Sequence, residues 1–168
     1  MANSIFEHIP PEQVALDLDL KTRKRAFEEA ARMIEVNSGL PQKAVFDAFT
    51  AREKIGSTCI GGSCAIPHGR IQGLKAPVIV VLRTNDSIDY DVFERRRVRL
   101  LFAVAVPERQ DEACARTLSE LTEMLKAKEM REAFMRAPDA YALLEAVERW
   151  EPPVITEDDF ADDEAAGS

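Results

Sequence analysis

Apolar positions recur along the chain with two periods, which separate helical from extended segments. In residues 21–38, Phe27, Ala30, Ala31 and Ile34 follow the i, i+3, i+4, i+7 spacing of one helix face, and Gly39 is a stop signal. A second helix is predicted at 41–54, with proline in its first turn. The same spacing predicts three further helices at residues 111–127, 128–136 and 139–150.

Two continuous apolar runs, APVIVVLRT (76–84) and VRLLFAVAV (98–106), lie between these helical segments. Runs that are apolar on both faces are typical of central strands covered on both sides. The segment SIDYDVFERR (87–96) between them predicts an edge strand or hairpin and is too short for a helical crossover, so part of the sheet should be antiparallel. The pattern predicts a single-domain α/β sandwich over residues 1–150, with a mixed parallel and antiparallel sheet flanked by helices on both faces.

The net charge of −8 is concentrated at one end of the chain. Residues 151–168 carry seven acidic side chains and no Lys or Arg, whereas residues 1–150 carry a net charge of −1. We therefore expect an acidic, disordered tail after a nearly neutral domain. The basic cluster Arg95–Arg97 is short and local, so no nucleic-acid partner is expected.

No apolar run approaches the length of a membrane-spanning helix. The N-terminus, MANSIFEHIPP, lacks the basic flank and apolar core of a signal peptide. We expect a cytoplasmic protein without membrane insertion.

The chain has three cysteines, and an odd number disfavours a disulfide scaffold. Cys59 and Cys64 with the distant Cys114 do not have zinc-site spacing, even if His68 is counted as a fourth ligand. We expect small buried thiols and no metal or other cofactor.

The stretch STCIGGSCAIPHGR (57–70) carries the clearest candidate chemistry. In it, Pro67 fixes its own φ and biases the preceding residue to an extended conformation, and Gly69 permits a close approach of another element. Between them stands His68, whose imidazole titrates near neutrality and is nucleophilic without a special activator. The alternative is a histidine with a structural role only.

Arg52 completes the apolar series of Val45, Ala48 and Phe49 on the second helix. It either caps the last carbonyls of that helix or projects into a site below the glycine loop, where its planar fork would bind phosphate. Arg70 is a second candidate anion ligand or a solvated surface charge.

The Gly/Ser loop itself contains Gly56, Gly61 and Gly62 with the hydroxyls of Ser57, Thr58 and Ser63. Backbone N–H groups in such loops form anion-binding nests. The loop has no P-loop lysine, which argues against nucleotide hydrolysis.

These motifs resemble those of a known family. The run AREKIGSTCIGGSCAIPHGRIQGLKAPVIVVLR (51–83) is similar to the mannitol/fructose-type IIA components of the bacterial phosphoenolpyruvate:sugar phosphotransferase system, and within them to the nitrogen regulatory IIA proteins. The segments 10–34, 45–58, 99–107 and 130–147 support the resemblance, which covers nearly all of residues 5–150.

The resemblance implies that His68 is a phosphorylated histidine, through Nε2, with Arg52 beside it to stabilise the phosphoryl group and with Ser57, Thr58, Gly69 and Arg70 in support. It implies a donor of the HPr type, a small histidine phosphocarrier, and no metal or nucleotide. The free-standing chain and the nitrogen-type similarity favour a regulator of other proteins, such as a kinase or an ion transporter. The alternatives are a sugar-uptake component that passes phosphate to a IIB protein, and a binding module that is not phosphorylated.

The chain also departs from the pattern STGIGNGIAIPH of many relatives. The residues Cys59, Gly62, Ser63 and Cys64 stand at the Gly, Asn, Gly and Ile positions, and the loss of a glycine at Ser63 affects the backbone there. Many relatives carry a second histidine where Cys114 stands here. A thiol does not readily hold positive charge beside a phosphate, so we assign Cys114 to the pocket or core.

Overall fold

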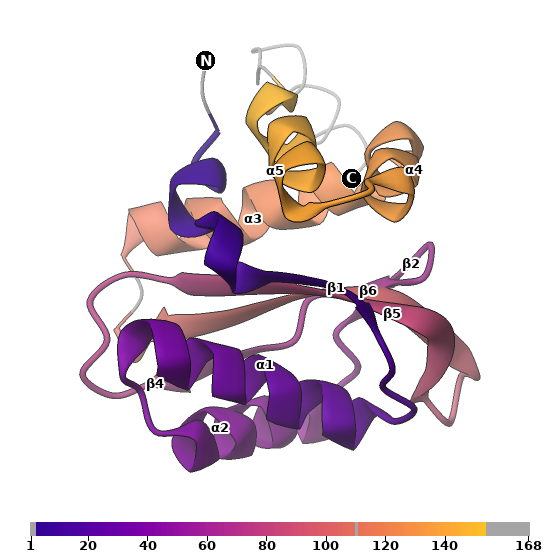
Figure 1. Cartoon of the computed structure of the whole chain (residues 1–168). Coiled ribbons are helices and arrows are strands. Elements are labelled where there is room, and N and C mark those ends of the chain that lie inside the picture. Colours follow the sequence, from indigo (N-terminus) through magenta and orange to yellow (C-terminus); the bar gives the residue numbers. More distant parts are fainter. Residues whose placement is uncertain (1–2, 110, 154–168) are drawn as a thin grey trace, which may run out of the picture.

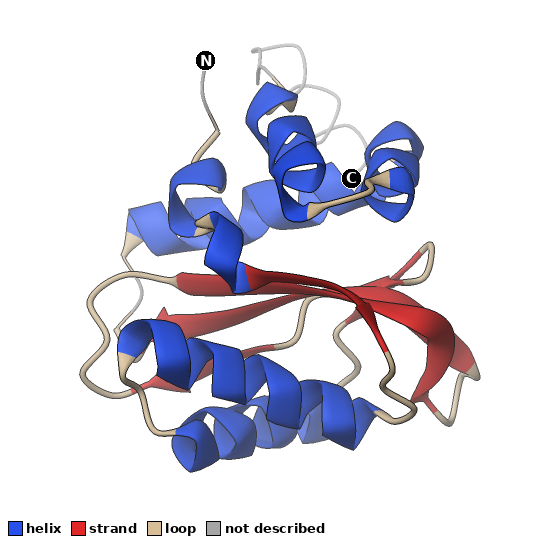
Figure 2. Ribbon diagram, in the orientation of Figure 1, coloured by secondary structure: helices blue, strands red, loops and turns tan. Residues whose placement is uncertain are grey.

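The computed structural model of the protein describes residues 3–109 and 111–153. A mixed sheet separates two layers of helices, and Figures 1 and 2 show α1 and α2 on one face and α3, α4 and α5 on the other. The strands are β1 (Val14–Leu18), β2 (Cys59–Gly61), β3 (Cys64–Ala65), β4 (His68–Ile71), β5 (Val78–Asp91) and β6 (Arg96–Pro107). The helices are α1 (Arg23–Ser38), α2 (Gln42–Ile55), α3 (Glu112–Lys126), α4 (Lys128–Arg136) and α5 (Ala140–Arg149), preceded by two 3-10 turns, η1 (Phe6–His8) and η2 (Pro11–Gln13).

The long β5–β6 hairpin is the centre of the sheet. The strand order is β1-β5-β6-β3-β2, and β4 also pairs with β6. The β5–β6 pair is antiparallel, whereas β1 is parallel to β5, and both β3 and β4 are parallel to β6. The mixed sheet with helices on both faces confirms the predicted α/β architecture.

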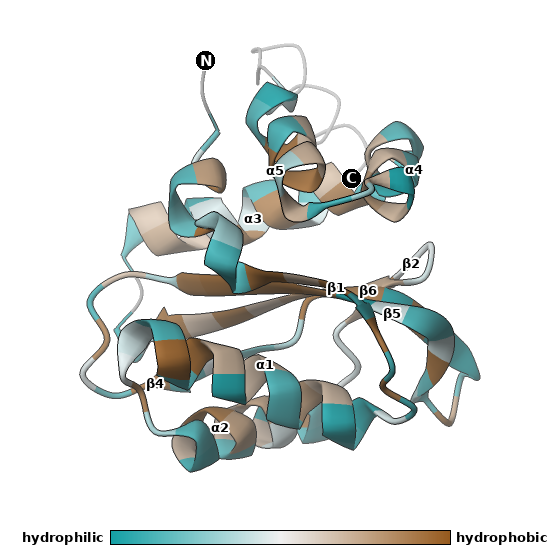
Figure 3. Cartoon of the chain, in the orientation of Figure 1, coloured by the Kyte–Doolittle hydropathy of each residue, from teal (hydrophilic) through white to brown (hydrophobic). Residues whose placement is uncertain are grey.

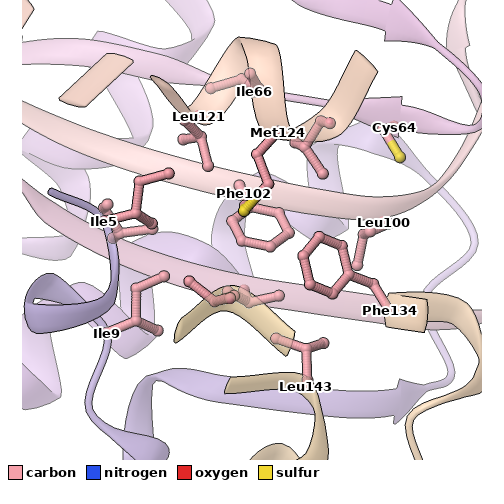
Figure 4. Close-up of a cluster of buried hydrophobic side chains, with 14 of the residues drawn as sticks. Ile5, Ile9, Cys64, Ile66, Leu100, Phe102, Leu121, Met124, Phe134 and Leu143 are labelled. Carbon is pink, nitrogen blue, oxygen red and sulfur yellow. The ribbon is translucent and has the colours of Figure 1, made fainter. Parts of the chain in front are cut away.

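Alternation along the two central strands builds two hydrophobic cores. Ile79, Val81 and Phe102 face the α3–α5 layer, and Figure 4 shows Phe102 beside Leu121 and Phe134 of that layer. Their strand neighbours, such as Val80 and Leu101, face α1 and α2. In Figure 3 the strands form the hydrophobic band between the helices, as the continuous apolar runs predicted.

Helix boundaries follow the signals in the sequence. The Thr22 side chain accepts a hydrogen bond from the Arg25 N–H at the start of α1, and Gly39 ends that helix with φ 79°. Asp111 and Asp139 cap α3 and α5 in the same way as Thr22. All five predicted helices are confirmed to within about two residues, the precision expected of helix ends.

The strands agree with the prediction in one respect and differ from it in another. The segment 87–96 forms a hairpin, one of its two predicted alternatives, because β5 and β6 extend into it from either side. The sequence predicted no strand before the first helix and none in the Gly/Ser loop, whereas β1 precedes α1 and three short strands, β2, β3 and β4, occupy that loop. The predicted acidic tail lies, from residue 154 onward, outside the described residues. The domain boundary at residue 150 stays a prediction.

Candidate functional site

His68 begins β4, at an edge of the sheet, where it pairs in parallel register with Val104 of β6. Its Nδ1 lies 2.8 Å from the Ile66 carbonyl oxygen. Because a carbonyl only accepts, Nδ1 carries the proton in this hydrogen bond, and Nε2 is left with the lone pair. The side chain is half-buried, and this burial lowers the pKa of His68 below its ordinary value, against the opposing effect of the Ile66 hydrogen bond. The geometry presents an imidazole whose Nδ1 proton is engaged and whose Nε2 keeps its lone pair.

Gly69 is the point where α2 comes closest to β4. A Cβ atom at this position would lie 2.7 Å from the Ala48 Cβ and 2.8 Å from the Ala48 carbonyl carbon. Only glycine therefore allows this approach of the helix to the strand. Arg52 stands one helical turn beyond Ala48, so the Gly69 contact determines how near Arg52 lies to His68.

Arg52 is half-buried at the C-terminal end of α2. Its Nη1 donates to the Gly56 carbonyl oxygen at 2.8 Å, which is the helix-capping contact anticipated as one of its two alternatives. The guanidinium also lies within electrostatic reach of His68, whose pKa its positive charge lowers further. Capping of the helix end and binding of phosphate are compatible roles for Arg52, because the hydrogen bond to Gly56 engages only one of the five N–H donors of its guanidinium.

Ser57 and Thr58 occupy different environments in the loop that follows α2. Ser57 is exposed, and its Oγ accepts a hydrogen bond from the Cys59 N–H at 3.2 Å. The Thr58 side chain is buried and bonded to Glu53 and Tyr90. Thr58 therefore supports the loop from inside the protein. Arg70, two residues along β4 from His68, is exposed.

The Gly/Ser loop, where an anion-binding nest stays a prediction, folds as the β2–β3 hairpin, with positive φ at Gly61, Gly62 and Ser63. The Gly62 position packs against the Arg131 side chain, and the Ser63 carbonyl accepts from the Arg99 and Leu100 N–H groups. Cys64 pairs with Leu100 of β6 and His68 pairs with Val104, four residues further along the strand. At about 3.3 Å per residue, the β2–β3 turn therefore lies about 13 Å from His68 along β6.

The three cysteines are free thiols and all are buried, as predicted. Burial raises the pKa of Cys64 to about 12, and also raises that of Cys114, so neither thiol is poised for reaction. Cys114 lies in the first turn of α3 and is 3% exposed, so it is buried, as its assignment to the pocket or core predicted. Within residues 3–109 and 111–153, no group of three or more His, Cys, Asp or Glu side chains could hold a metal ion.

Sequence reasoning missed Glu53 and Tyr90. Glu53 is only 8% exposed, although it stands in a charged stretch that resembles a solvated helix end. Tyr90 is fully buried on the segment 87–96, whose polar composition suggested an edge. The period-two alternation of Ile88 and Tyr90 with polar neighbours is the signal that could have identified it.

Across the part of the chain that the structure describes, no helix is long and apolar enough to span a membrane.

Comparison with known proteins places this geometry in a family. The family model for the phosphoenolpyruvate-dependent sugar phosphotransferase system, EIIA 2, matches residues 7–150. The nitrogen regulatory protein of Pseudomonas aeruginosa is 34% identical over 129 residues, which cover 75% of this chain and 82% of the relative. The fructose-specific EIIABC component of Bacillus subtilis is 25% identical over 144 residues, which cover 85% of this chain and 23% of that protein.

Solved structures show the same fold. The crystal structure of the nitrogen regulatory protein IIA-Ntr from Neisseria meningitidis superimposes with a TM-score of 0.79 at 34% identity, and the match covers 84% of this chain and 97% of that one. The mannitol IIA protein of Escherichia coli, in its complex with phosphorylated IIB, shares the fold with a TM-score of 0.69 at 18% identity, covering 83% of this chain and 96% of that one. The chain therefore belongs to the EIIA type 2 family of the phosphoenolpyruvate-dependent sugar phosphotransferase system.

Proposed function

We propose that the protein accepts a phosphoryl group on Nε2 of His68 from an HPr-like phosphocarrier, and that its phosphorylation state regulates other proteins in the nitrogen branch of the system. Membership of the family makes the chain a phosphotransfer component. The observation that carries the finer proposal is the hydrogen bond from Nδ1 to the Ile66 carbonyl, which leaves Nε2 as the nucleophile. We place this reaction in the cytoplasm.

The transfer is an in-line displacement at phosphorus. The P–N bond of the carrier's phosphohistidine breaks as the bond to Nε2 of His68 forms, and the His68 Nδ1 proton stays in its hydrogen bond to Ile66. The protein's task is then to position the imidazole and to stabilise the charge of the transferring oxygens. We assign the second part of that task to Arg52, whose hydrogen bond to Gly56 leaves other N–H donors and whose positive charge acts on His68.

The test is phosphorylation of the purified protein by a phosphorylated HPr-like carrier, measured by intact mass. Wild-type protein should gain one phosphoryl group, and His68→Gln should gain none. His8→Gln is the matched control, since His8 is the other histidine of the chain, and it should be phosphorylated normally. Arg52→Ala should accept phosphate more slowly than Arg52→Lys. Phosphorylation of His68→Gln at the wild-type rate would refute the assignment.

The regulatory role rests on the nitrogen regulatory relatives at 34% identity. Phosphorylation adds about two negative charges to a domain of net charge −1, which is enough to change the binding of a partner such as a kinase or an ion transporter. Phosphorylated and unphosphorylated protein should therefore retain different targets in a pull-down. A protein that accepts no phosphate and still retains a target would instead indicate a non-phosphorylated binding module.

A second candidate function is sugar uptake, with phosphate passed to a IIB protein. The fructose-specific relative and the shared fold of the mannitol IIA protein favour it. The discriminating experiment mixes the phosphorylated protein with purified fructose-type and mannitol-type IIB domains. Rapid loss of phosphate from His68 to either IIB domain supports uptake, and its retention supports regulation.

A further inference from the structure

A buried hydrogen-bonded cluster joins the end of α2 to the Gly/Ser loop and to the β5–β6 hairpin. The Glu53 Oε1 accepts from the Thr58 N–H at 2.9 Å, and its Oε2 accepts from the Thr58 hydroxyl at 2.7 Å. The Tyr90 hydroxyl lies 2.6 Å from the Thr58 hydroxyl and 3.3 Å from the Glu53 Oε2. Burial, and then the Glu53 charge, raises the pKa of Tyr90, so the phenol stays protonated and is the donor.

We propose that Glu53, Thr58 and Tyr90 form a positioning network that fixes His68 and Arg52 relative to each other for phosphoryl transfer. None of the three needs to touch the phosphoryl group. The inference rests on the proposed function of His68, but it concerns residues that the family comparisons do not assign.

The network reaches His68 through a short chain of backbone hydrogen bonds. Thr58, held by Glu53 through both its N–H and its hydroxyl, accepts the Ile66 N–H on its carbonyl oxygen at 3.0 Å. The Ile66 carbonyl in turn accepts the His68 Nδ1 proton at 2.8 Å. The position of the imidazole therefore depends on where Thr58 is held.

The network reaches Arg52 through the helix. Glu53 follows Arg52 directly in α2, and its anchored carboxylate fixes the rotation of the last helical turn. The Arg52 guanidinium bonds the Gly56 carbonyl, which lies between the two anchored residues Glu53 and Thr58. A loose Glu53 would release both the helix end and the loop that Arg52 caps.

The charge of Glu53 points to a role beyond stability. A buried carboxylate is costly to desolvate, and among the described residues Glu53 forms no ion pair that would offset this cost. A neutral glutamine could accept one of these two Thr58 hydrogen bonds through its single carbonyl oxygen, whereas the carboxylate accepts both. The negative charge acts on His68, whose pKa it raises while the Arg52 charge lowers it.

Among the described residues, Arg52 and Glu53 are the charged groups that shift the pKa of His68, and its β6 neighbour Val104 is apolar. At the other end of the network, Arg23 donates to the Tyr90 carbonyl oxygen at 2.7 Å. Because the Glu53 charge raises the pKa of His68, removing that charge should lower it.

The experiment measures single-turnover phosphoryl transfer from a phosphorylated HPr-like carrier, and separately titrates the His68 imidazole by NMR. Glu53→Gln should keep the fold, slow the transfer at saturating carrier by tenfold or more, change the half-saturating carrier concentration less than twofold, and lower the His68 pKa. The rate estimate follows from the roughly hundredfold loss caused by a misplacement of about 1 Å.

Glu120 provides the matched control, because its carboxylate also accepts one backbone N–H and one hydroxyl, both from Ser4. Glu120 belongs to α3, and Glu120→Gln should leave the transfer rate and the His68 pKa unchanged. Wild-type values of both quantities in folded Glu53→Gln would overturn the proposal.

A second pair of variants tests the positioning network if Glu53→Gln does not fold. Thr58→Val removes the hydroxyl and keeps the Glu53 charge, so transfer should slow while Thr58→Ser restores it. Equal rates for Thr58→Val and wild type would overturn the proposal. The NMR titration needs no phosphoryl transfer, so a protein that accepts no phosphate at all would refute the proposed function while the titration still tests the network.

Discussion

The contact between Gly69 and Ala48 makes a prediction that links packing to phosphoryl transfer. In Gly69→Ala the new Cβ would lie 2.7 Å from the Ala48 Cβ and 3.0 Å from the Ala48 carbonyl oxygen. Carbon atoms prefer separations of about 3.5–4.0 Å, so α2 must move away from β4 by about 1 Å. Such overpacking costs about 1–3 kcal/mol, which corresponds to a fall in Tm of roughly 3–10 °C for a domain of this size.

The same movement carries Arg52 away from His68, because Arg52 follows Ala48 by one helical turn. Misplacement by about 1 Å lowers rates by up to about a hundredfold. Thermal unfolding followed by circular dichroism and the rate of phosphate acceptance should therefore both fall in Gly69→Ala, with the rate measured well below the variant's Tm.

Gly56→Ala is the control for loss of a glycine in the same region. Gly56 has an extended φ of 171° and no atom within 4 Å of an added Cβ, so alanine should raise stability slightly, by about 0.4–1 kcal/mol. A Gly69→Ala protein with the Tm and transfer rate of wild type would refute the account of how α2 is placed against β4.

Three further predictions concern the backbone at Ser63, the buried cation Arg83 and the pH dependence set by His68. Ser63 has a left-handed φ of 64°, so Ser63→Gly should stabilise the fold by about 0.5–1 kcal/mol and raise its Tm; a lower Tm would contradict the backbone assignment. Arg83→Met should lower the urea midpoint, with a loss of about 2–4 kcal/mol, because it leaves the carbonyls of Phe134 and Ala137 unpaired; an unchanged midpoint would contradict this. The His68 pKa is lowered from 6.5, so the neutral nucleophile persists into acid, and the acid limb of the transfer rate should have its midpoint below pH 6.5. The unfolded chain binds this proton more readily, so stability should fall as pH drops below 6.5, and less steeply in His68→Gln.

The helices and the two central strands could be predicted because each satisfies a local rule. The i, i+3, i+4 spacing defines the helix faces, and the run from Val98 to Val106 could only be buried on both sides. The strand β1 was missed because five residues with weak alternation, VALDL, acquire strand structure from pairing with β5. β2, β3 and β4 have two to four residues each and depend still more on their partners.

In the candidate site, too, the residues that satisfy a local rule could be predicted and those that depend on distant partners could not. His68 and Gly69 could be singled out because Pro and Gly constrain the backbone locally, and Arg52 because it occupies the next position on the apolar face of its helix. The cluster of Glu53 with Tyr90 could not be predicted, since 37 residues separate the two and only the folded hairpin brings them together. The assignment of Thr58 to the interior has the same origin.

The central claim is that Nε2 of His68 is the phosphoryl acceptor, and ¹⁵N- and ³¹P-detected NMR of the phosphorylated protein tests it most directly. The account predicts one phosphohistidine, on His68, with phosphorus bonded to Nε2 and the Nδ1 proton still donated to the Ile66 carbonyl. Phosphorus on Nδ1, or on any other residue, would contradict it.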